Sequence, residues 1–569
     1  MKTTTFTLLA SLLIWANINA QSFSWAKSVG GNDDDIAYSI TCDNSGNVYV
    51  TGDFYGTVDF DPGSGVYNLT SSGWEDIFIQ KLDSAGNFLW AKSIGGGYFD
   101  AGTSINTDDA GNIYIVGAFG QSVDFNPGNG VYNLTSVGND DIFILKLNSA
   151  GNFVWAKSIG GSDFDTGISI SIDKLGNIYV TGIYKDTADF DPGSGTFNLS
   201  SNGDEDIFML KLDSAGNFVW AKSIGGSDFD AGGSIKVDNA GNVYITGGFS
   251  ATVDFDPGSG QYNLSSAGDV DVFVLKIDSA GNFVWARSLG GSDDDESYSL
   301  IIDKKGNIYT AGMFEGTVDF DPGSGVFNLT SAGNWDIFVQ KLDNSGNFVW
   351  AKSMGGSDDD MVNGIVGDKD GNIYFVGEFL GTMDFDPSSG VFNLTSAGNE
   401  DVFLEKLDSA GNFVWANKMG GNDYDEGNCI ALDKAGNVYI AGSYEGVADF
   451  NPGSGIFNLS SKGLSDIFVE KFNARPVNIS KAKTSPFTMS LFPNPNEGDF
   501  TLEISTKDNK AGNFNLEIYS ALGKLIHSES LTINGSLVKP MHFDKLSKGV
   551  YFIRLQNNTG VYNARFVVD

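Results

Sequence analysis

A tryptophan returns every 65 residues through most of this sequence. Each copy contains a segment close to Asn-Phe-Val-Trp-Ala-Lys-Ser, which is followed by Gly-Gly. The seven tryptophans are Trp25, Trp90, Trp155, Trp220, Trp285, Trp350 and Trp415. A period this strict, without an insertion, indicates seven copies of one supersecondary unit. The repeat therefore constrains the architecture of most of the 569-residue chain.

Within one copy, four β-prone runs alternate with turns that contain glycine. In the first copy these runs are residues 37–43, 48–52, 76–82 and 88–93. Four antiparallel strands per unit, repeated seven times, predict an all-β fold, a seven-bladed β-propeller. A solenoid is the alternative, but it would need atypical capping repeats, and the terminal copies here resemble the middle ones.

The two ends of the repeat array are complementary. The chain begins with a fourth strand alone, at residues 23–28, and the seventh copy stops after its third strand, at residues 465–472. We expect the N-terminal strand to pair with the last copy, because this pairing would close the ring and remove an exposed sheet edge.

An insertion between the second and third strands lengthens every copy. In the first copy it spans residues 56–70, with two short alternating arms around Pro62-Gly63-Ser64-Gly65. This pattern predicts an extra hairpin. We expect the hairpins and the Gly-Gly-x-Asp loops to build one face of the propeller, and function usually lies in such long loops.

The segments Gly46-Asn47-Val48-Tyr49 and Gly111-Asn112-Ile113-Tyr114 recur in the other copies. They resemble the bacterial seven-bladed β-propeller repeat family, often called SBBP repeats, and the resemblance covers residues 22–473. It implies the propeller fold. It implies no particular activity, because a fold does not determine a function.

The first residues have the pattern of an export signal. Lys2 precedes an apolar run from Phe6 to Trp15, and polar residues then lead to Ala20. This pattern predicts a secretory signal peptide over residues 1–20, with cleavage after Ala20. We therefore expect a secreted protein that is soluble or attached to the cell surface.

The composition changes after residue 473, which divides the chain into further regions. We predict a propeller over residues 21–473, a linker over 474–485 and a C-terminal domain over 486–569, where alternating strands and Gly turns indicate a small antiparallel β-sandwich.

Three ordered motifs of this domain resemble the type A sorting domain of the type IX secretion system of Bacteroidota. The motif residues are Pro493, Asn494, Pro495, Gly523, Lys524, Gly549 and Tyr551. The resemblance implies recognition by the type IX machinery, passage across the outer membrane, and then release or surface attachment.

Charge and composition exclude several classes of function. The net charge of −38 argues against binding to nucleic acid or anionic membranes, and no segment is long enough for insertion into a bilayer. Both histidines, His527 and His542, lie outside the repeats, which removes most hydrolase and zinc chemistry there. The repeats also contain no Gly-x-Ser-x-Gly elbow and no phosphate loop. We therefore predict no catalytic residues and no enzymatic activity.

Recurring aspartates are the candidate metal ligands. One set opens each insertion, and an Asp or Asn follows two residues later in an Asp-x-Asp/Asn-x-Gly or similar loop. Oxygen ligands of this kind suit Ca²⁺, which accepts six to eight of them. The alternative is that these side chains accept backbone N–H groups and fix turns. The candidates are Asp59, Asp61, Asp124, Asn126, Asp189, Asp191, Asp254, Asp256, Asp319, Asp321, Asp384, Asp386, Asp449 and Asn451.

The two cysteines, Cys42 and Cys429, fall on inner strands that ring closure would make neighbours. Their positions differ by three residues within the repeat, a shift of roughly 10 Å along the strands. That distance is beyond the reach of a disulfide. We expect two separate buried thiols.

Taken together, these features predict a secreted or cell-surface β-propeller that acts as a non-catalytic binding or adhesion scaffold. Its ligand would be a surface glycan or protein that the sequence does not identify. Two alternatives remain at this point: a structural surface-layer component and a polysaccharide-active enzyme.

Overall fold

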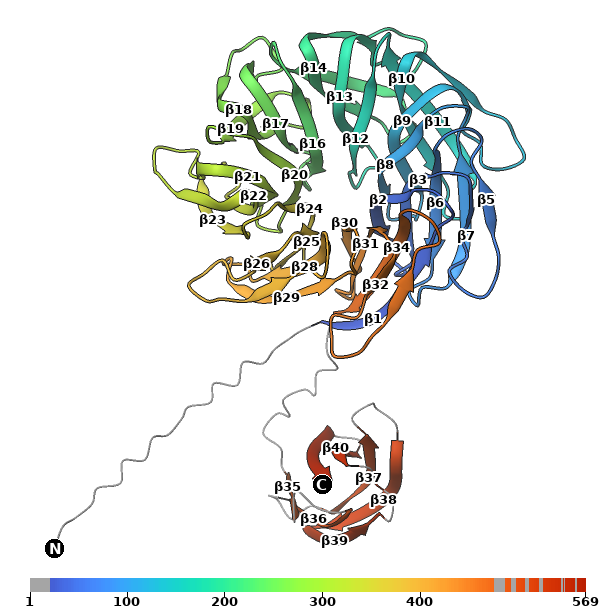
Figure 1. The fold of residues 1–569 in the computed structure, drawn as a ribbon, viewed down its shortest axis with the longest axis vertical. Coiled ribbons are helices and arrows are strands. Elements are labelled where there is room, and N and C mark those ends of the chain that lie inside the picture. The colour runs from blue at the N-terminus through green and yellow to red at the C-terminus, as the bar shows by residue number, and fades with distance from the viewer. Residues whose placement is uncertain are drawn as a thin grey trace, which may run out of the picture. The chain divides into compact units, whose positions relative to one another are not determined.

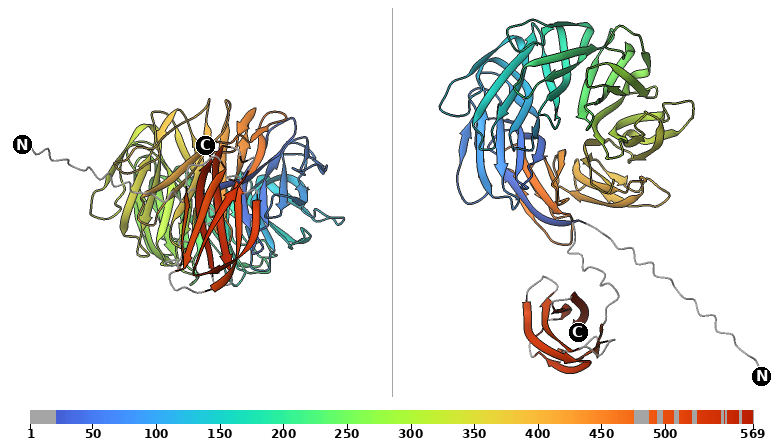
Figure 2. Two further views of the ribbon diagram at one scale, coloured as in Figure 1. Left: turned by 90° about the horizontal axis from the view of Figure 1, so that it is seen from below. Right: turned by 180° about the vertical axis from the view of Figure 1, so that it is seen from behind.

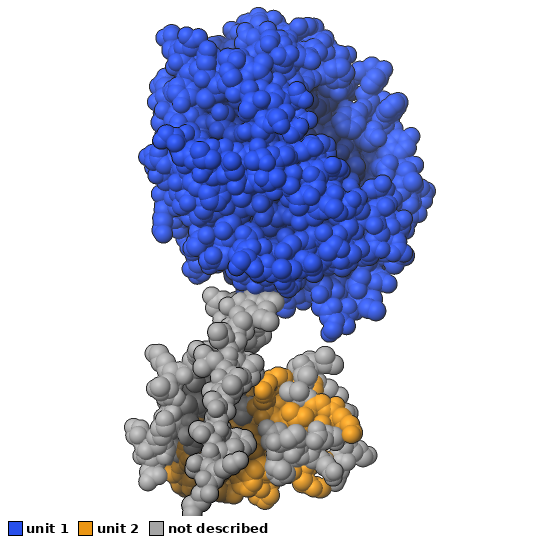
Figure 3. All heavy atoms as spheres, turned by 60° about the vertical axis from the view of Figure 1, so that its left-hand side comes forward, with its two compact units in different colours: residues 1–475 blue, residues 476–569 orange. Residues whose placement is uncertain are grey.

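The structure is a computed structural model. It describes residues 21–474, 487–492, 498–506, 511–520, 525–543, 546, 548–557 and 560–568. The chain divides into two compact units, residues 1–475 and 476–569 (Figure 3). The predicted signal peptide and all but the first residue of the predicted linker lie outside the described residues. Every regular element of the described residues is a β-strand, and none of them forms a helix that could cross a membrane.

The first unit is a ring of four-stranded antiparallel groups, which confirms the all-β propeller prediction (Figures 1 and 2). Five groups are separate sheets, and two more are joined in one eight-stranded sheet, so the strand pairing gives seven groups. We call these groups blades 1 to 7, in chain order from the group that starts at Asp35.

The innermost strands surround the centre of the ring (Figure 1). They are β2 (Asp35–Cys42), β8 (Asp100–Thr107), β12 (Asp165–Ile172), β16 (Asp230–Val237), β20 (Asp295–Ile302), β24 (Asp360–Gly367) and β30 (Asp425–Leu432). The second strands are β3 (Val48–Phe54), β9 (Ile113–Asp124), β13 (Ile178–Asp189), β17 (Val243–Asp254), β21 (Ile308–Asp319), β25 (Ile373–Phe379) and β31 (Val438–Tyr444).

The third and outer strands complete each blade. The third strands are β6 (Asp76–Leu82), β10 (Asn133–Leu147), β14 (Asn198–Leu212), β18 (Asn263–Ile277), β22 (Asn328–Leu342), β28 (Asp401–Leu407) and β34 (Asp466–Asn473). The outer strands are β7 (Phe88–Ile94), β11 (Phe153–Gly161), β15 (Phe218–Ile224), β19 (Phe283–Leu289), β23 (Phe348–Met354), β29 (Phe413–Met419) and β1 (Ser22–Val29).

The N-terminal strand closes the ring, as predicted. β1 pairs with β34 antiparallel, with a register from Ser22 opposite Asn473 to Val29 opposite Ile467. In Figure 1 this strand, in blue, lies beside the orange strands of the last copy. The innermost strands contact one another in order around the ring, and β2 contacts β30 across the closure. The repeat array therefore leaves no blade without its fourth strand.

The core lies between neighbouring blades. Tyr49 is fully buried against Ile113 and Ile115 of the next blade, and its ring meets Trp90 edge-on at 6.3 Å between centroids. The indole of Trp90 also lies against Gly151 of the next blade, which has a φ of +76° and where a β-carbon would come within 3.2 Å of the indole. Trp90 thus packs between two blades.

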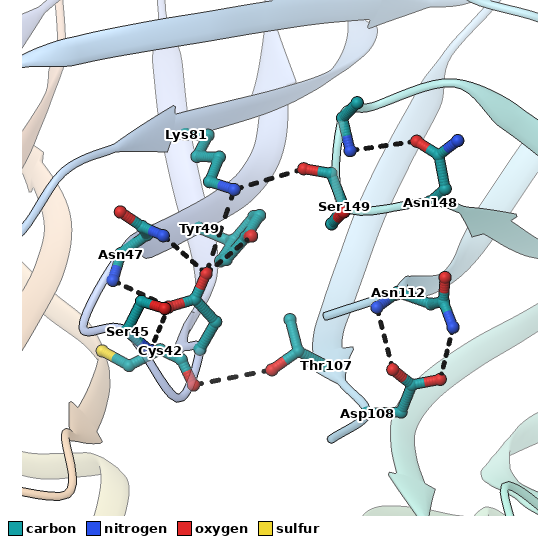
Figure 4. Close-up of polar contacts among 12 residues, drawn as sticks. Cys42, Ser45, Asn47, Tyr49, Lys81, Thr107, Asp108, Asn112, Asn148 and Ser149 are labelled. Carbon is teal, nitrogen blue, oxygen red and sulfur yellow. Dashed lines mark hydrogen bonds and ion pairs between the residues drawn. The ribbon is translucent and has the colours of Figure 1, made fainter. Parts of the chain in front are cut away.

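A lysine on six of the seven third strands donates a hydrogen bond to a backbone carbonyl of the next blade. Lys81 Nζ lies 4.7 Å from the centroid of the Tyr49 ring and donates a hydrogen bond of 3.2 Å to the carbonyl oxygen of Ser149 in the next blade (Figure 4). A lysine that is both above an aromatic ring and bonded to a carbonyl combines two favourable interactions of its charge.

The inserted hairpins fold back against the blades instead of standing up from one face. In blade 1 the hairpin is β4 (Thr57–Asp59) and β5 (Asn68–Thr70). Phe60 is fully buried against Phe78. The ring of Tyr67 packs on Phe88, which lies at the opposite end of the outer strand from the Gly-Gly loop. The expectation that the hairpins help to build one face is therefore wrong, because the hairpin extends along the blade from the buried Phe60 to Tyr67, which lies beside the far end of the outer strand.

Hairpins of the same kind occur in the other blades. Separate pairs form β26 (Thr382–Asp384) with β27 (Asn393–Thr395) and β32 (Val447–Asp449) with β33 (Asn458–Ser460). In the remaining blades the hairpin arms continue the second and third strands.

The second unit is a seven-stranded antiparallel sheet in the order β35-β36-β39-β38-β37-β40-β41. In the described residues β38 and β39 pair only at Asn534 and Ser536, and Phe500 packs on Phe566 from the other end of the sheet. The sheet therefore folds over its own core. Its strands are β35 (Phe487–Phe492), β36 (Asp499–Thr506), β37 (Ala511–Ser520), β38 (Leu525–Asn534), β39 (Ser536–His542), β40 (Gly549–Asn557) and β41 (Gly560–Val568).

Both cysteines are free thiols, as predicted. Cys429 is buried, whereas Cys42 is half-buried, so the prediction of two buried thiols is wrong for Cys42. Cys42 is the last residue of β2, where the strand reaches the end of the ring and solvent.

Candidate functional site

The candidate calcium ligands lie in the turns of the hairpins. Asp59 Oδ1 accepts hydrogen bonds from the backbone N–H groups of Asp61, at 3.1 Å, and Tyr67, at 2.7 Å. Asp61 Oδ1 accepts one from Gly63 N–H at 2.8 Å. Asn126 makes the same contact with Gly128 N–H at 2.9 Å. An amide oxygen thus serves as well as a carboxylate at the second position.

These contacts are those of the turn-forming alternative. Among the described residues, no group of three or more His, Cys, Asp or Glu side chains is arranged to hold a metal ion. Ca²⁺ requires six to eight oxygen ligands, and each hairpin brings only two candidate side chains together. The two candidate side chains of one hairpin are therefore too few to form a calcium site without further ligands. Calcium binding stays a prediction.

A second set of carboxylates holds the Gly-Gly loops. Asp100 is fully buried; its Oδ2 accepts from Gly96 N–H at 2.7 Å and its Oδ1 from Gly120 N–H at 3.1 Å. Burial raises the pKa of Asp100 to about 7. A β-carbon on Gly95 would collide with the Asp76 carboxylate, so the glycine pair leaves room for two buried aspartates. Asp100 therefore fixes the backbone of the loop through both of its carboxylate oxygens.

Some positions that differ widely between copies lie on the innermost strands. One such position lies thirteen residues after each tryptophan. Its residues are Tyr38, Thr103, Ile168, Gly233, Tyr298, Asn363 and Asn428. All seven line a central cavity of ≈ 410 Å³. Sixteen residues after each tryptophan they are Thr41, Asn106, Ser171, Lys236, Ile301, Val366 and Ala431. The framework thus repeats while the central channel varies.

Carboxyl groups gather at one end of this channel, at the ends of the second strands near the Gly-Gly loops. Glu378 is buried and its Oε2 accepts from Asn363 Nδ2 at 2.9 Å. Burial, followed by the nearby Glu426 carboxylate, raises the pKa of Glu378 to about 8. Burial also raises the pKa of Asp53 to about 7, with Glu75 nearby. We call Asp53, Glu75, Glu378 and Glu426 the acidic rim.

Sequence reasoning did not identify the channel residues or the acidic rim. Variation between the copies could have identified them. Asp53 and Glu378 occupy the same position of the repeat, and the other blades have Ala118, Ile183, Gly248, Met313 and Ser443 there. The candidates predicted from the sequence were instead residues that recur in every copy, and such residues stabilise the fold.

Two of the sorting-motif residues lie in the described part of the second unit. Gly549 begins β40 with a φ of +151°, and Tyr551 is buried against Phe566. Pro493, Asn494, Pro495, Gly523 and Lys524 lie outside the described residues. The two described residues therefore have structural roles in the sheet.

Two protein families match segments of the chain. Residues 490–569 match the family described as Secretion system C-terminal sorting domain. Residues 25–53, 154–182 and 284–313 match the family described as Beta-propeller repeat.

Curated proteins are similar over part of their length. "Uncharacterized WD repeat-containing protein L264" of Acanthamoeba polyphaga mimivirus is 26% identical over 505 residues, which is 74% of this chain and 36% of that protein. "Regulatory protein FlaEY" of Caulobacter vibrioides is 28% identical over 172 residues, which is 29% of this chain and 17% of that protein. The chain thus spans well under two thirds of either relative.

Among solved structures, a structural genomics protein of unknown function from Bacteroides thetaiotaomicron is 12% identical, and the match covers 70% of this chain and 94% of that chain. The TM-score of this match is 0.20, so it supports no inference about this chain. The family matches and the ring of strands together place the chain: it is a β-propeller repeat protein with a C-terminal sorting domain that directs export by the type IX secretion system to the cell surface or the extracellular space.

Proposed function

We propose that the exported propeller is a non-catalytic binding or adhesion scaffold whose ligand contacts the channel and the acidic rim. The observation that carries this proposal is the distribution of variation among the copies. Residues that recur in all blades, such as Asp100 and Trp90, are engaged by their own or neighbouring blades. Residues that differ include Asn363, which lines the channel, and Glu378, which accepts a hydrogen bond from Asn363.

This distribution is typical of a rigid frame that presents a specific surface. A ring of internally satisfied blades holds its inner strands in fixed positions, so a ligand would not have to order them on binding. A purely structural surface-layer component would have no need for inner strands that differ from blade to blade. We therefore favour a binding protein over that alternative.

Catalysis has less support. The first unit contains no histidine, and the buried rim carboxyl Glu378 accepts a hydrogen bond from the amide of Asn363. A raised pKa alone is also common in structural carboxyl clusters. We propose that the rim contributes to recognition.

An array of surface glycans and extracellular proteins, probed with the full chain, tests this proposal. We expect a retained partner whose signal falls at least about tenfold in the variant E378Q/E426Q/D53N, because hydrogen bonds to charged groups contribute about 1.5–3 kcal/mol each. The control variant Asp186→Asn changes an exposed carboxylate on a hairpin and should bind normally. Unchanged binding by the rim variant, or turnover of an arrayed glycan, would contradict the proposal.

A further inference from the structure

Lys236 is a charged residue at a position that carries no charge in the other six blades. It is near the end of the innermost strand β16, sixteen residues after Trp220. The equivalent residues are Thr41, Asn106, Ser171, Ile301, Val366 and Ala431. Six blades form the same strand without an ammonium group at this position. The fold therefore does not require one.

The side chain lies where two parts of the central channel meet. Lys236 lines both the ≈ 410 Å³ cavity between the innermost strands and a cavity of ≈ 480 Å³ at the channel end where the strand 1–strand 2 turns lie. The walls of the second cavity include Val237, Ile302 and Leu432. Cavities of about 300–1,000 Å³ with mostly apolar walls and a few polar groups are typical of small-molecule sites.

No protein carboxylate compensates the charge. Lys236 has no ion pair or hydrogen bond with any residue in the part of the chain that the structure describes. Burial lowers the pKa of its ammonium group, and no neighbouring charge raises it. A half-buried charge without a partner is unfavourable unless a ligand compensates it.

The charges at the mouth of the second cavity do not provide that compensation. Asp303 and Asp368 border the cavity, but their carboxylates accept hydrogen bonds within their own turns, from Asn307 and Asn372 respectively. Lys304 borders the same mouth. An anion that approaches this end of the channel would therefore meet a lysine at the entrance and another inside.

We propose that the channel binds a small amphipathic anion, whose carboxylate pairs with Lys236 and whose apolar part occupies the cavity beside Ile302 and Leu432. The ammonium would supply a charge-assisted hydrogen bond to the carboxylate. The apolar walls would favour a hydrocarbon chain or ring over a purely polar anion. This site is separate from the acidic rim, which lies at the other end of the channel.

Calorimetric titration of the full chain with octanoate and with 1-octanol tests the proposal. The two probes share an apolar chain and differ in charge. We expect octanoate to bind at least about tenfold more tightly than 1-octanol, the effect of one hydrogen bond to a charged group. Lys236→Met should remove this difference while leaving 1-octanol binding nearly unchanged, and Lys236→Arg should keep most of it.

Lys92→Met is the matched control, because Lys92 lies on an outer strand away from the channel. This variant should bind octanoate like the unchanged protein. Equal affinity of the unchanged protein for the two probes, an undiminished preference for octanoate in Lys236→Met, or no binding of either probe would overturn the proposal. Circular dichroism and thermal unfolding of each variant would show that the ring is intact.

Discussion

Lys471 in the last blade donates a hydrogen bond of 2.6 Å to the carbonyl oxygen of Ser84 in the first blade, across 387 residues of sequence. The same bond joins Lys81 to Ser149 and Lys341 to Ser409 in other neighbouring blades. The closure between the last and first blades therefore has the same polar contact as the interfaces within the repeat. The exception is blade 6, where Lys406 Nζ instead donates to Tyr374 in its own blade, at 2.6 Å.

Removing the closing lysine should weaken the ring. Lys471→Met keeps the apolar stem but removes a hydrogen bond from a charged group, so we expect a loss of about 1.5–3 kcal/mol in the free energy of unfolding. Urea unfolding followed by tryptophan fluorescence measures it. Lys406→Met serves as the control for loss of the charge without loss of an interblade bond, and should cost less. An equal cost for both variants would show that the interblade bond from Lys471 to Ser84 stabilises the ring no more than the bond within blade 6 from Lys406 to Tyr374.

The N-terminal strand should be required for a monomeric ring. A chain that begins at residue 30 would lack β1 and expose the edge of β34, together with Phe468 and Phe472, which are buried in the closed ring. Free edges pair with other chains, so we expect oligomers or aggregates in light scattering. Adding a synthetic peptide of residues 21–30 should restore the monomer. A stable monomer without β1 or the peptide would contradict strand closure.

The propeller and its closure could be predicted because they depend on local patterns: turn residues, alternation and the spacing of Trp25 and its equivalents. The packing of the hairpins could not. Their alternating arms predict a hairpin, but only the blade shows that Phe60 is buried against Phe78. The channel was missed for a related reason, because recurrence marks residues such as Asp100 that support the fold, whereas Lys236 occurs once.

The hairpin aspartates provide a test of calcium binding. Asp61→Asn keeps the acceptor for Gly63 N–H, as Asn126 and Asn451 already show in their own blades. We therefore expect almost no loss of thermal stability in calcium-free buffer, whereas Asp61→Ala should lose about 1 kcal/mol or slightly more. In a variant with Asp61 and its aspartate equivalents all changed to Asn, we expect that adding millimolar calcium does not change the melting temperature. A calcium-dependent rise in the unchanged protein that the Asn variant lacks would instead establish a calcium site.

Export should depend on the second unit. Because residues 490–569 match the sorting domain, a chain that ends at residue 485 should fold but remain in the periplasm. Cell fractionation with an antibody against the propeller measures this directly. A single change, Gly549→Val, should also reduce export, since the φ of +151° at Gly549 strains a β-branched residue. Truncated protein on the cell surface would show that another signal suffices.

Two buried glutamates should make stability depend on pH. Glu405 and Glu470 are fully buried, and both carboxyl oxygens of each lack a hydrogen-bond partner among the described residues. Gln80 and Gln340 hold the same position in other blades, where each Nε2 donates to a phenylalanine carbonyl at 2.7 Å, on Phe60 and Phe320 respectively. A neutral Glu405 could donate its O–H to the corresponding carbonyl of Phe385, whereas a carboxylate could not.

Burial raises the pKa of both glutamates well above the ordinary value, and nearby aspartates add to this effect. A pKa raised in the folded state means that the stabilisation is fully present below the unfolded pKa, about 4.3, and is lost as pH rises through the folded pKa. The neutral glutamine has no such dependence. Glu405→Gln and Glu470→Gln should therefore change little at pH 4 and stabilise the protein at pH 8.

We expect the gain at pH 8 to be about 1–3 kcal/mol per site, the cost of an unsatisfied buried polar group. Other carboxyls with raised pKa values, such as Asp35 at about 8, also contribute to the slope, so the measured quantity is the difference between variant and unchanged protein in urea unfolding at each pH. The reverse change, Gln80→Glu, should destabilise the protein more at pH 8 than at pH 4. A difference that stays constant between these pH values would mean that Glu405 and Glu470 do not titrate on unfolding, and that their burial is compensated in some other way.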